Sequence, residues 1–203
     1  MKQQMVIPWR STEEPWRLKH FEFLYDYYSD HFEIVIGDHA GDFNRSAARN
    51  AGVNACTSDV VIVLDADNYI EDIEQINTSV YAAERNQILA KPFKWFGYLT
   101  EDSTNAFYDF YGMPVDKEYD FINPPQVNFT GGAYVMKRSL WQQLGGMDEG
   151  FIGWGAEDDA WHITCTKNGI PIQYNVGFDY HLYHPAFRQT SKENYDKLVR
   201  EYL

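Results

Sequence analysis

Two acidic residues, Asp65 and Asp67, follow directly on the apolar run DVVIVL at positions 59–64. A β-branched run of this kind predicts a strand buried on both faces, so the two carboxylates are expected at its carboxyl end. Oxygen ligands suit Mg²⁺ or Mn²⁺, and a metal held there can neutralise a departing diphosphate. The alternative is a solvated turn in which Asp67 caps a helix from Tyr69. The alternating strands and helices around the motif favour the metal.

A second acidic segment, GWGAEDD, occupies positions 153–159. The helix dipole favours acids at a helix start, but this does not explain the Gly-Trp-Gly that precedes them. Trp154 can offer its ring to the face of a sugar, and a neighbouring carboxylate can take a proton from an attacking hydroxyl. We interpret the segment as a functional site rather than as a helix start alone.

Two histidines, His181 and His184, lie three residues apart late in the chain. A lone histidine is usually structural. Together with the acidic pair, however, these two can complete a metal site that begins at Asp67.

The segment GDFNRSAARN, at positions 41–50, contains two arginines. Arg45 can fork onto a phosphate or onto the edge of a base. The alternatives are that Ser46 is an ordinary N-cap and that Arg49 is a surface salt-bridge partner.

The elements that must position these residues alternate along the first 85 residues. Ser11 and Glu14 have the spacing of a capping box, which predicts that they open the first helix. The alternation predicts a parallel sheet covered by helices, with ligands at the carboxyl ends of its strands. Strands are expected at 5–8, 32–38 and 59–64, and helices after each of them, including 46–56 and a helix marked by Ile70, Ile73, Ile76 and Val80.

The second half of the chain is less regular. Residues 95–130 predict loops and short strands, and a capping-box pair at Thr190 and Glu193 is expected to open a C-terminal helix. Further strands are expected at 133–136 and 172–176, and helices at 139–144 and 156–168.

Composition limits the classes of function. A chain of 203 residues suits one domain, and its formal net charge of −13 argues against a nucleic-acid partner and against a metal nuclease. The two cysteines, Cys56 and Cys165, have no metal-ligand spacing, which favours a reducing compartment. We find no apolar run long enough for a signal peptide or a transmembrane segment.

Taken together, these segments resemble the GT-A glycosyltransferases. The resemblance is strongest to the β-1,4-galactosyltransferase family and weaker to the polypeptide N-acetylgalactosaminyltransferases. The Gly-Trp-Gly-x-Glu-Asp-Asp block, following an Asp-x-Asp motif, is the discriminating feature. The residues that carry the resemblance are Pro8-Trp9-Arg10, Gly41-Asp42, Phe43-Asn44-Arg45, Asp65-Ala66-Asp67, Gly131-Gly132, the block 153–159, and His184 with His181 as the fallback.

The resemblance implies an α/β fold with a single GT-A domain over residues 1–203, built on a Rossmann-like, mostly parallel sheet with flanking helices. Residues 1–68 would form the nucleotide-binding part, and residues 95–189 would complete the acceptor and metal sites. The implied activity is inverting transfer of a sugar, with galactose or N-acetylgalactosamine as the first expectation. The donor would be a UDP-sugar, and the acceptor a hydroxyl of a carbohydrate or another molecule.

The resemblance also implies a role for each site residue. Asp67 and His184 would hold Mn²⁺ or Mg²⁺, and Asp65 would reach the metal through water or contact the ribose. Asp158 would be the general base. The donor-binding residues would be Pro8, Trp9, Arg10, Asp42, Phe43, Arg45, Asp65 and Gly132, and the acceptor-binding residues Trp154, Gly155, Glu157 and Asp159.

Two rival functions share part of this pattern. A retaining transferase like the polypeptide N-acetylgalactosaminyltransferases would share the fold, the metal and the late histidine, but would lack the second acid at Asp158. A non-catalytic sugar-binding module would not need Asp67, His184 and Asp158 together. The short chain, without a membrane stem or cysteine pairs, suggests a bacterial or phage protein that acts in the cytoplasm.

Overall fold

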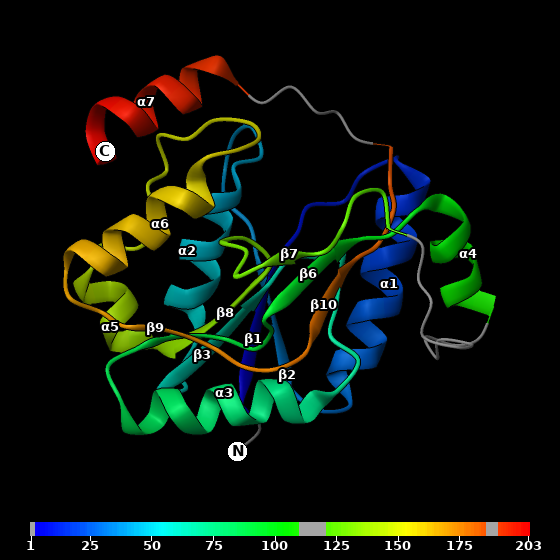
Figure 1. Cartoon of the computed structure of the whole chain (residues 1–203), viewed down its shortest axis with the longest axis horizontal. Helices are drawn as coiled ribbons and strands as arrows, with labels where there is room; N and C mark the ends of the chain where they lie inside the picture. The colour runs from blue at the N-terminus through cyan, green and yellow to red at the C-terminus, as the bar shows by residue number, and fades with distance from the viewer. Residues whose placement is uncertain (1–2, 110–120, 186–190) are drawn as a thin grey trace.

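A six-stranded sheet lies at the centre of the computed structural model, which describes residues 3–109, 121–185 and 191–203 (Figure 1). The strand order is β2-β1-β3-β8-β5-β9. Strand β8 runs antiparallel to both of its neighbours, and the other five strands share one direction, so the predicted mostly parallel sheet is confirmed. The strands are β1 (Gln4–Pro8), β2 (Glu33–Gly37), β3 (Val60–Leu64), β5 (Leu89–Lys91), β8 (Ala133–Lys137) and β9 (Ile172–Tyr174).

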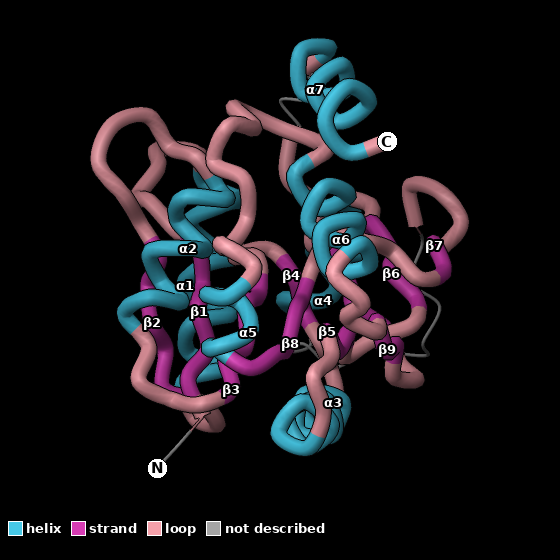
Figure 2. The backbone as a smooth tube through the Cα atoms, turned by 90° about the vertical axis from the view of Figure 1, so that its left-hand side faces the viewer, coloured by secondary structure: helices cyan, strands magenta, loops and turns pink. Residues whose placement is uncertain are grey.

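Helices cover both faces of this sheet (Figure 2). Alternate residues of a strand point to opposite faces. Met5 and Ile7 therefore pack with α1 and α3, whereas Val6 packs in a second cluster with α2, α5 and α6. The helices are α1 (Pro15–Ser29), α2 (Arg45–Ala55), α3 (Ile73–Arg85), α4 (Glu101–Asp109), α5 (Arg138–Gln143), α6 (Glu157–Lys167) and α7 (Lys192–Tyr202).

A second, four-stranded sheet has the order β4-β10-β6-β7. Short strands were expected within residues 95–130, but the sequence does not show that they join a sheet. Strand β10 pairs antiparallel with β4, with His181 opposite Asn68, and so lies directly beside the end of the Asp-Ala-Asp motif. The strands are β4 (Asn68–Tyr69), β6 (Trp95–Tyr98), β7 (Gln126–Val127) and β10 (Phe178–His181).

The predicted start of the first helix is wrong. Helix α1 begins at Pro15, and Glu14 is the N-cap, since its carboxylate accepts hydrogen bonds from the backbone N–H groups of Trp16 and Arg17. Proline suits the first helical position because its missing N–H would have no partner there. Ser11 lies outside the helix.

Two other helix starts also differ from expectation. Asp72 caps α3, so Asp67 does not cap the helix that follows it, and the solvated-cap alternative is wrong. Ser191 caps α7 by accepting a hydrogen bond from the backbone N–H of Asn194. Thr190, the predicted partner of Glu193, lies outside the described residues.

Within the described residues no helix has the length and apolar character needed to cross a membrane. Cys56 and Cys165 are both buried and free. Burial raises the pKa of the Cys56 thiol to about 11 and that of Cys165 to about 12, so both are protonated structural side chains.

Candidate functional site

Asp67, His181 and His184 meet at the carboxyl end of β3. The Oδ2 atom of Asp67 lies 3.2 Å from Nε2 of His184 and 3.7 Å from Nε2 of His181. One ligand atom from each of the three residues lies within 4.8 Å of the others, which is the geometry of a divalent metal site. Both His181 and His184 therefore lie close to Asp67, and either or both can serve as a metal ligand with it.

Backbone pairing explains why these residues meet. Strand β10 lies against β4, and the N–H of Leu182 donates to the carbonyl of Asp67 over 2.8 Å. This hydrogen bond fixes the chain between the two histidines directly over the Asp-Ala-Asp turn, so that both imidazoles can reach one carboxylate.

The charges of this cluster suit metal ligands. Burial acts to raise the pKa of Asp67, but the nearby imidazoles of His181 and His184 outweigh it and lower that pKa well below its usual value. Burial lowers the pKa of His181 to about 4. Asp67 is therefore ionised and His181 neutral at neutral pH, and these are the forms that bind a metal.

His20 was predicted only as part of the helical pattern of α1. It supports the cluster through contacts of both of its ring nitrogens. Its Nε2 lies 2.7 Å from the carbonyl of Tyr183, and its Nδ1 lies 2.6 Å from the hydroxyl of Tyr108. Burial lowers the pKa of His20 to about 4, so the ring is neutral and Nε2 donates to the carbonyl. His20 therefore fixes the backbone just before His184.

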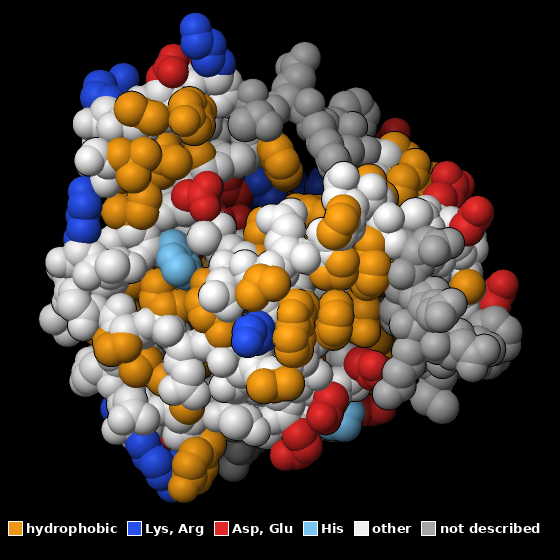
Figure 3. All heavy atoms as spheres, viewed as in Figure 1, with side chains coloured by type: hydrophobic (Ala, Val, Ile, Leu, Met, Phe, Trp, Pro, Cys, Tyr) orange, Lys and Arg blue, Asp and Glu red, His pale blue; other side chains and the backbone are white. Residues whose placement is uncertain are grey.

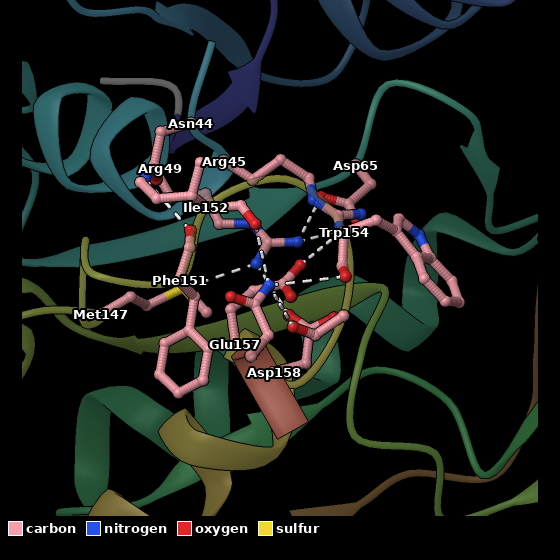
Figure 4. A network of polar contacts seen from close by, with 12 residues as sticks. Asn44, Arg45, Arg49, Asp65, Met147, Phe151, Ile152, Trp154, Glu157 and Asp158 are labelled. Atoms are coloured by element: carbon pink, nitrogen blue, oxygen red, sulfur yellow. Dashed lines mark hydrogen bonds and ion pairs between the residues drawn. The ribbon is translucent and has the colours of Figure 1, made fainter. Parts of the chain in front are cut away.

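A second cluster joins α2 to the acidic block (Figure 4). Arg49 is fully buried and holds two carboxylates, with Nη2 at 2.6 Å from Asp65 and Nη1 at 2.7 Å from Asp158. Arg45, one turn earlier on the same helix, pairs with Glu157 at 2.5 Å. The expectation that Arg49 is a surface salt-bridge partner is wrong. The i, i+4 spacing of the two arginines was the available signal that they share a helix face.

The arginines set the charge state of the acids in this cluster. Burial acts to raise the pKa of Asp158, but Arg49 and Arg45 outweigh it and lower that pKa to about 2. Burial raises the pKa of Asp65, although Arg49 opposes the shift. Asp158 is therefore firmly ionised at neutral pH.

The two predicted metal-binding aspartates have different surroundings. Asp67 lies with the histidines, whereas both carboxylate oxygens of Asp65 accept from Nη2 of Arg49, at 2.6 and 2.9 Å. Asp65 is thus linked through Arg49 to Asp158, whereas Asp67 is the aspartate that lies with the histidines.

The Gly-Trp-Gly segment forms a tight loop before α6. Gly153, Gly155 and Ala156 all have positive φ, at 81°, 99° and 72°, which glycine adopts readily and alanine rarely. The side-chain amide of the buried Asn194 on α7 donates to the carbonyls of Ile152 and Gly155, at 3.0 and 3.1 Å. The loop is thereby held in a shape that leaves Trp154 38% exposed.

The other predicted acceptor and donor positions lie around this loop. Asp159 is exposed, and its carboxylate accepts from the hydroxyl of Thr130 over 2.7 Å. A β-carbon at Gly131 would lie 2.8 Å from Oδ2 of Asp158, and one at Gly132 would lie 2.5 Å from Oδ2 of Asp179. The two glycines therefore let the chain pass close to these carboxylates.

The predicted nucleotide-binding loop is organised by Arg10. Its guanidinium pairs with Asp38 at 2.5 Å and also donates to the carbonyls of His39 and Gly41. It lies 5.6 Å from the centre of the Phe43 ring, which is 38% exposed.

Pro8 and Trp9, which precede Arg10 in the Pro-Trp-Arg motif, are fully and partly buried, respectively. Trp9 stacks on Phe21 of α1, with ring centres 4.4 Å apart, so one of its faces is covered. Pro8 is buried at the end of β1, and Asp42 is exposed. Figure 3 shows a hollow in the upper part of the molecule, in which acidic side chains adjoin deeper basic ones.

Solved structures share this fold. The catalytic domain of Drosophila β-1,4-galactosyltransferase 7, in complex with xylobiose, is 18% identical with a TM-score of 0.60 over 99% of this chain and 80% of that one. Residues 1–349 of S. aureus TarS, in complex with UDP-GlcNAc, are 12% identical with a TM-score of 0.63 over 98% and 65%. GalNAc-T7, with UDP, GalNAc and Mn²⁺, is 13% identical with a TM-score of 0.57 over 97% and 47%.

Two families match the sequence itself. Residues 118–185 match the family described as the N-terminal domain of galactosyltransferase, which covers about a third of the chain. Residues 22–145, more than half of the chain, match glycosyl transferase family 2. The chain therefore belongs to glycosyl transferase family 2, and it is a glycosyltransferase of GT-A fold that resembles the galactosyltransferases.

Proposed function

We propose that the protein is a metal-dependent, inverting glycosyltransferase that moves a sugar from a UDP-sugar to an acceptor hydroxyl. The observation that carries the proposal is the cluster of Asp67, His181 and His184 at the end of β3, next to Asp65, which Arg49 links to the ionised Asp158. A metal ligand set and a candidate base are the two parts that metal-dependent, inverting sugar transfer uses.

The ligand set suits Mn²⁺ better than Mg²⁺. Asp67 offers an ionised carboxylate, and the two histidines offer imidazole nitrogens. Mg²⁺ prefers oxygen ligands throughout, whereas Mn²⁺ accepts this mixed set. When bound, the metal offsets the negative charge that develops on the departing diphosphate. We assign Asp65 to contact the metal through a water molecule or to contact the ribose, because Arg49 already binds its carboxylate.

Asp158 is assigned the role of general base. Its low pKa keeps it ionised at neutral pH, so it can accept a proton, although it is a weak base before reaction. The acceptor hydroxyl becomes acidic only as its oxygen bonds to the anomeric carbon. Proton transfer to Asp158 therefore accompanies or follows that bond formation. Attack from the face opposite the leaving UDP gives inversion.

The donor is assigned to the first part of the chain, residues 1–68. Arg10 and the exposed ring of Phe43 offer a cation and an aromatic face to the uridine, with Pro8, Trp9 and Asp42 shaping the loop around them. Arg45 is assigned to the donor diphosphate, and its ion pair with Glu157 ties it to the acceptor block. Gly132 is assigned to the donor sugar.

The acceptor is assigned to residues of the second part, 95–189. Trp154 offers its exposed ring to an acceptor sugar, and Gly155 lets the loop turn beneath it. Glu157 and Asp159 orient acceptor hydroxyls on either side of Asp158.

The ligands of the structural neighbours support UDP as the nucleotide. UDP-Gal and manganese are named for a D211N mutant of Drosophila β-1,4-galactosyltransferase 7, and UDP-GlcNAc for TarS. Galactose is the first expectation for the sugar because residues 118–185 match a galactosyltransferase domain, and N-acetylgalactosamine is the second.

Assay of the purified protein with UDP-Gal, UDP-GalNAc, UDP-GlcNAc and UDP-Glc tests this function. Release of UDP should require Mn²⁺, should be abolished by a chelator, and should be fastest with UDP-Gal or UDP-GalNAc. Arrays of sugar acceptors with the best donor then provide a product for NMR. A β-linked product from an α-linked donor supports inversion, and an α-linked product would instead establish the retaining alternative.

A further inference from the structure

Arg49 occupies the centre of the polar cluster that joins α2 to the acidic block. It is 0% exposed, and it reaches from α2 to two carboxylates that lie on different elements (Figure 4). Asp65 follows β3, and Asp158 lies in the first turn of α6. One side chain therefore links the end of the central sheet to the helix that carries the proposed base.

We propose that Arg49 is a positioning residue for sugar transfer, which fixes the Asp158 carboxylate so that its Oδ2 atom faces the acceptor. Oδ1 of this carboxylate accepts hydrogen bonds from Nη1 of Arg49 at 2.7 Å and from the hydroxyl of Tyr134 at 2.5 Å. Oδ2 points toward Gly131, which has no side chain to block it. The inference rests on the proposed role of Asp158 as base.

The shape of the guanidinium suits this role. Its planar fork donates to Asp65 from Nη2 and to Asp158 from Nη1, so the angle between the two carboxylates is set by one rigid group. A lysine ammonium keeps the charge but lacks this fixed geometry. Because Arg49 is fully buried, it is not available in this state as a direct ligand of the donor phosphates.

Its packing holds the fork in place. The guanidinium lies 5.5 Å from the centre of the Tyr134 ring, and Nη1 lies 3.5 Å from the sulfur of Met147. Tyr134 thus supports Arg49 with its ring and donates to the same Asp158 oxygen with its hydroxyl. Loss of that hydroxyl should loosen Asp158 without changing any charge.

The test measures transfer by Arg49→Lys and by Tyr134→Phe. For each, we expect kcat to fall by about tenfold or more, while the donor Kd and both KM values change by less than about threefold. Arg138→Lys, at the first residue of α5 just after β8, is the matched control and should transfer normally. If Arg49→Lys fails to fold by circular dichroism, Tyr134→Phe carries the same test. An unchanged kcat, or a loss confined to donor affinity, would overturn the proposal.

A double-mutant cycle separates positioning from general loss of structure. If Arg49 acts through Asp158, adding Arg49→Lys to Asp158→Asn should lower the residual transfer by less than about twofold. The same tenfold factor in both backgrounds would overturn the inference about Arg49 and leave the proposed function standing. Near-normal transfer by Asp158→Asn alone would instead overturn the assignment of the base, and with it the role inferred for Arg49.

Discussion

His181 and His184 reach the same carboxylate because the chain leaves β10 directly after His181. Strand geometry would send the side chains of residues 181 and 184 to opposite faces. The hydrogen bond from Leu182 to the carbonyl of Asp67 bends the chain over the Asp-Ala-Asp turn instead, so both imidazoles face Asp67. All three residues should therefore contribute to metal affinity.

Alanine substitution of Asp67, His181 or His184 should weaken Mn²⁺-dependent binding of the UDP-sugar by at least about tenfold, since each removes a ligand atom. Titration calorimetry with and without Mn²⁺ on folded variants measures this. His31→Ala, at an exposed histidine, is the control and should bind as the wild type does. Unchanged metal-dependent affinity in all three variants would remove the assignment of the site.

Asp158→Asn keeps the shape of the side chain but cannot accept a proton at neutral pH. We expect this variant to bind the donor and Mn²⁺ normally and to lose transfer by about a hundredfold, within the range of general base catalysis. Asp159→Asn is the matched comparison and should mainly raise the KM of the acceptor, because we assign Asp159 to orientation. Steady-state kinetics with both substrates distinguishes the two effects. Near-normal turnover by Asp158→Asn would contradict the proposed mechanism.

At the scale of elements, α7 acts as a brace for the acceptor loop. Leu198 of α7 packs with Phe151 and Ala160, which lie on either side of the Gly-Trp-Gly segment. Asn194, only 4% exposed, donates its amide to two carbonyls of that segment. The position of Trp154 thus depends on a helix about 40 residues further along the chain.

Asn194→Ala should loosen the loop by leaving the carbonyls of Ile152 and Gly155 without this donor. The expected result is a rise of about three- to tenfold in the KM of the acceptor, equivalent to roughly one hydrogen bond, with unchanged donor affinity. Asp196→Ala, at an exposed position of the same helix, is the control. An equal loss of donor and acceptor affinity would show that α7 supports the whole cleft rather than this loop.

At the scale of the whole molecule, the burial of His20 makes stability depend on pH, because a buried histidine resists protonation. The pKa of His20 falls from 6.5 to about 4 on folding, because burial disfavours the charged ring. Between those values the unfolded chain binds a proton that the native state does not. His20 therefore lowers the free energy of unfolding by roughly 3 kcal/mol as pH falls from about 6.5 to about 4. The burial of His181 adds a contribution of the same sign. Asp179, whose pKa burial raises to about 8, contributes with the opposite sign over this range.

Urea unfolding of the metal-free protein at several pH values between 7 and 4 measures this dependence. His20→Gln should remove the His20 contribution, because glutamine does not titrate, so its free energy of unfolding should fall less, or rise more, over this pH range than that of the wild type. His31→Gln, at an exposed position, should leave the slope as in the wild type. Equal slopes in all three proteins would show that His20 is not the group responsible.

The sequence by itself determined those features that depend on local pattern. The run predicted at 59–64 forms the buried strand β3 at residues 60–64, and Asp65 and Asp67 stand at its carboxyl end, because a run of apolar β-branched residues favours a buried strand. The alternation of the first 85 residues likewise specifies the helix-covered, mostly parallel sheet. The acidic block 157–159 does begin a helix, as expected.

Only the tertiary structure decided which distant residues meet. His181 joins Asp67 because β10 pairs with β4, and the register of a strand with its partner is not encoded in either segment alone. Arg49 is buried because the face of α2 that carries it is covered by Asp65, 16 residues away, and by Asp158, 109 residues away. A helical period shows that a residue lies on a given face, but the packing partner of that face is settled by long-range contacts. From the sequence alone, Arg49 could therefore be taken for a surface residue, although the fold buries it completely.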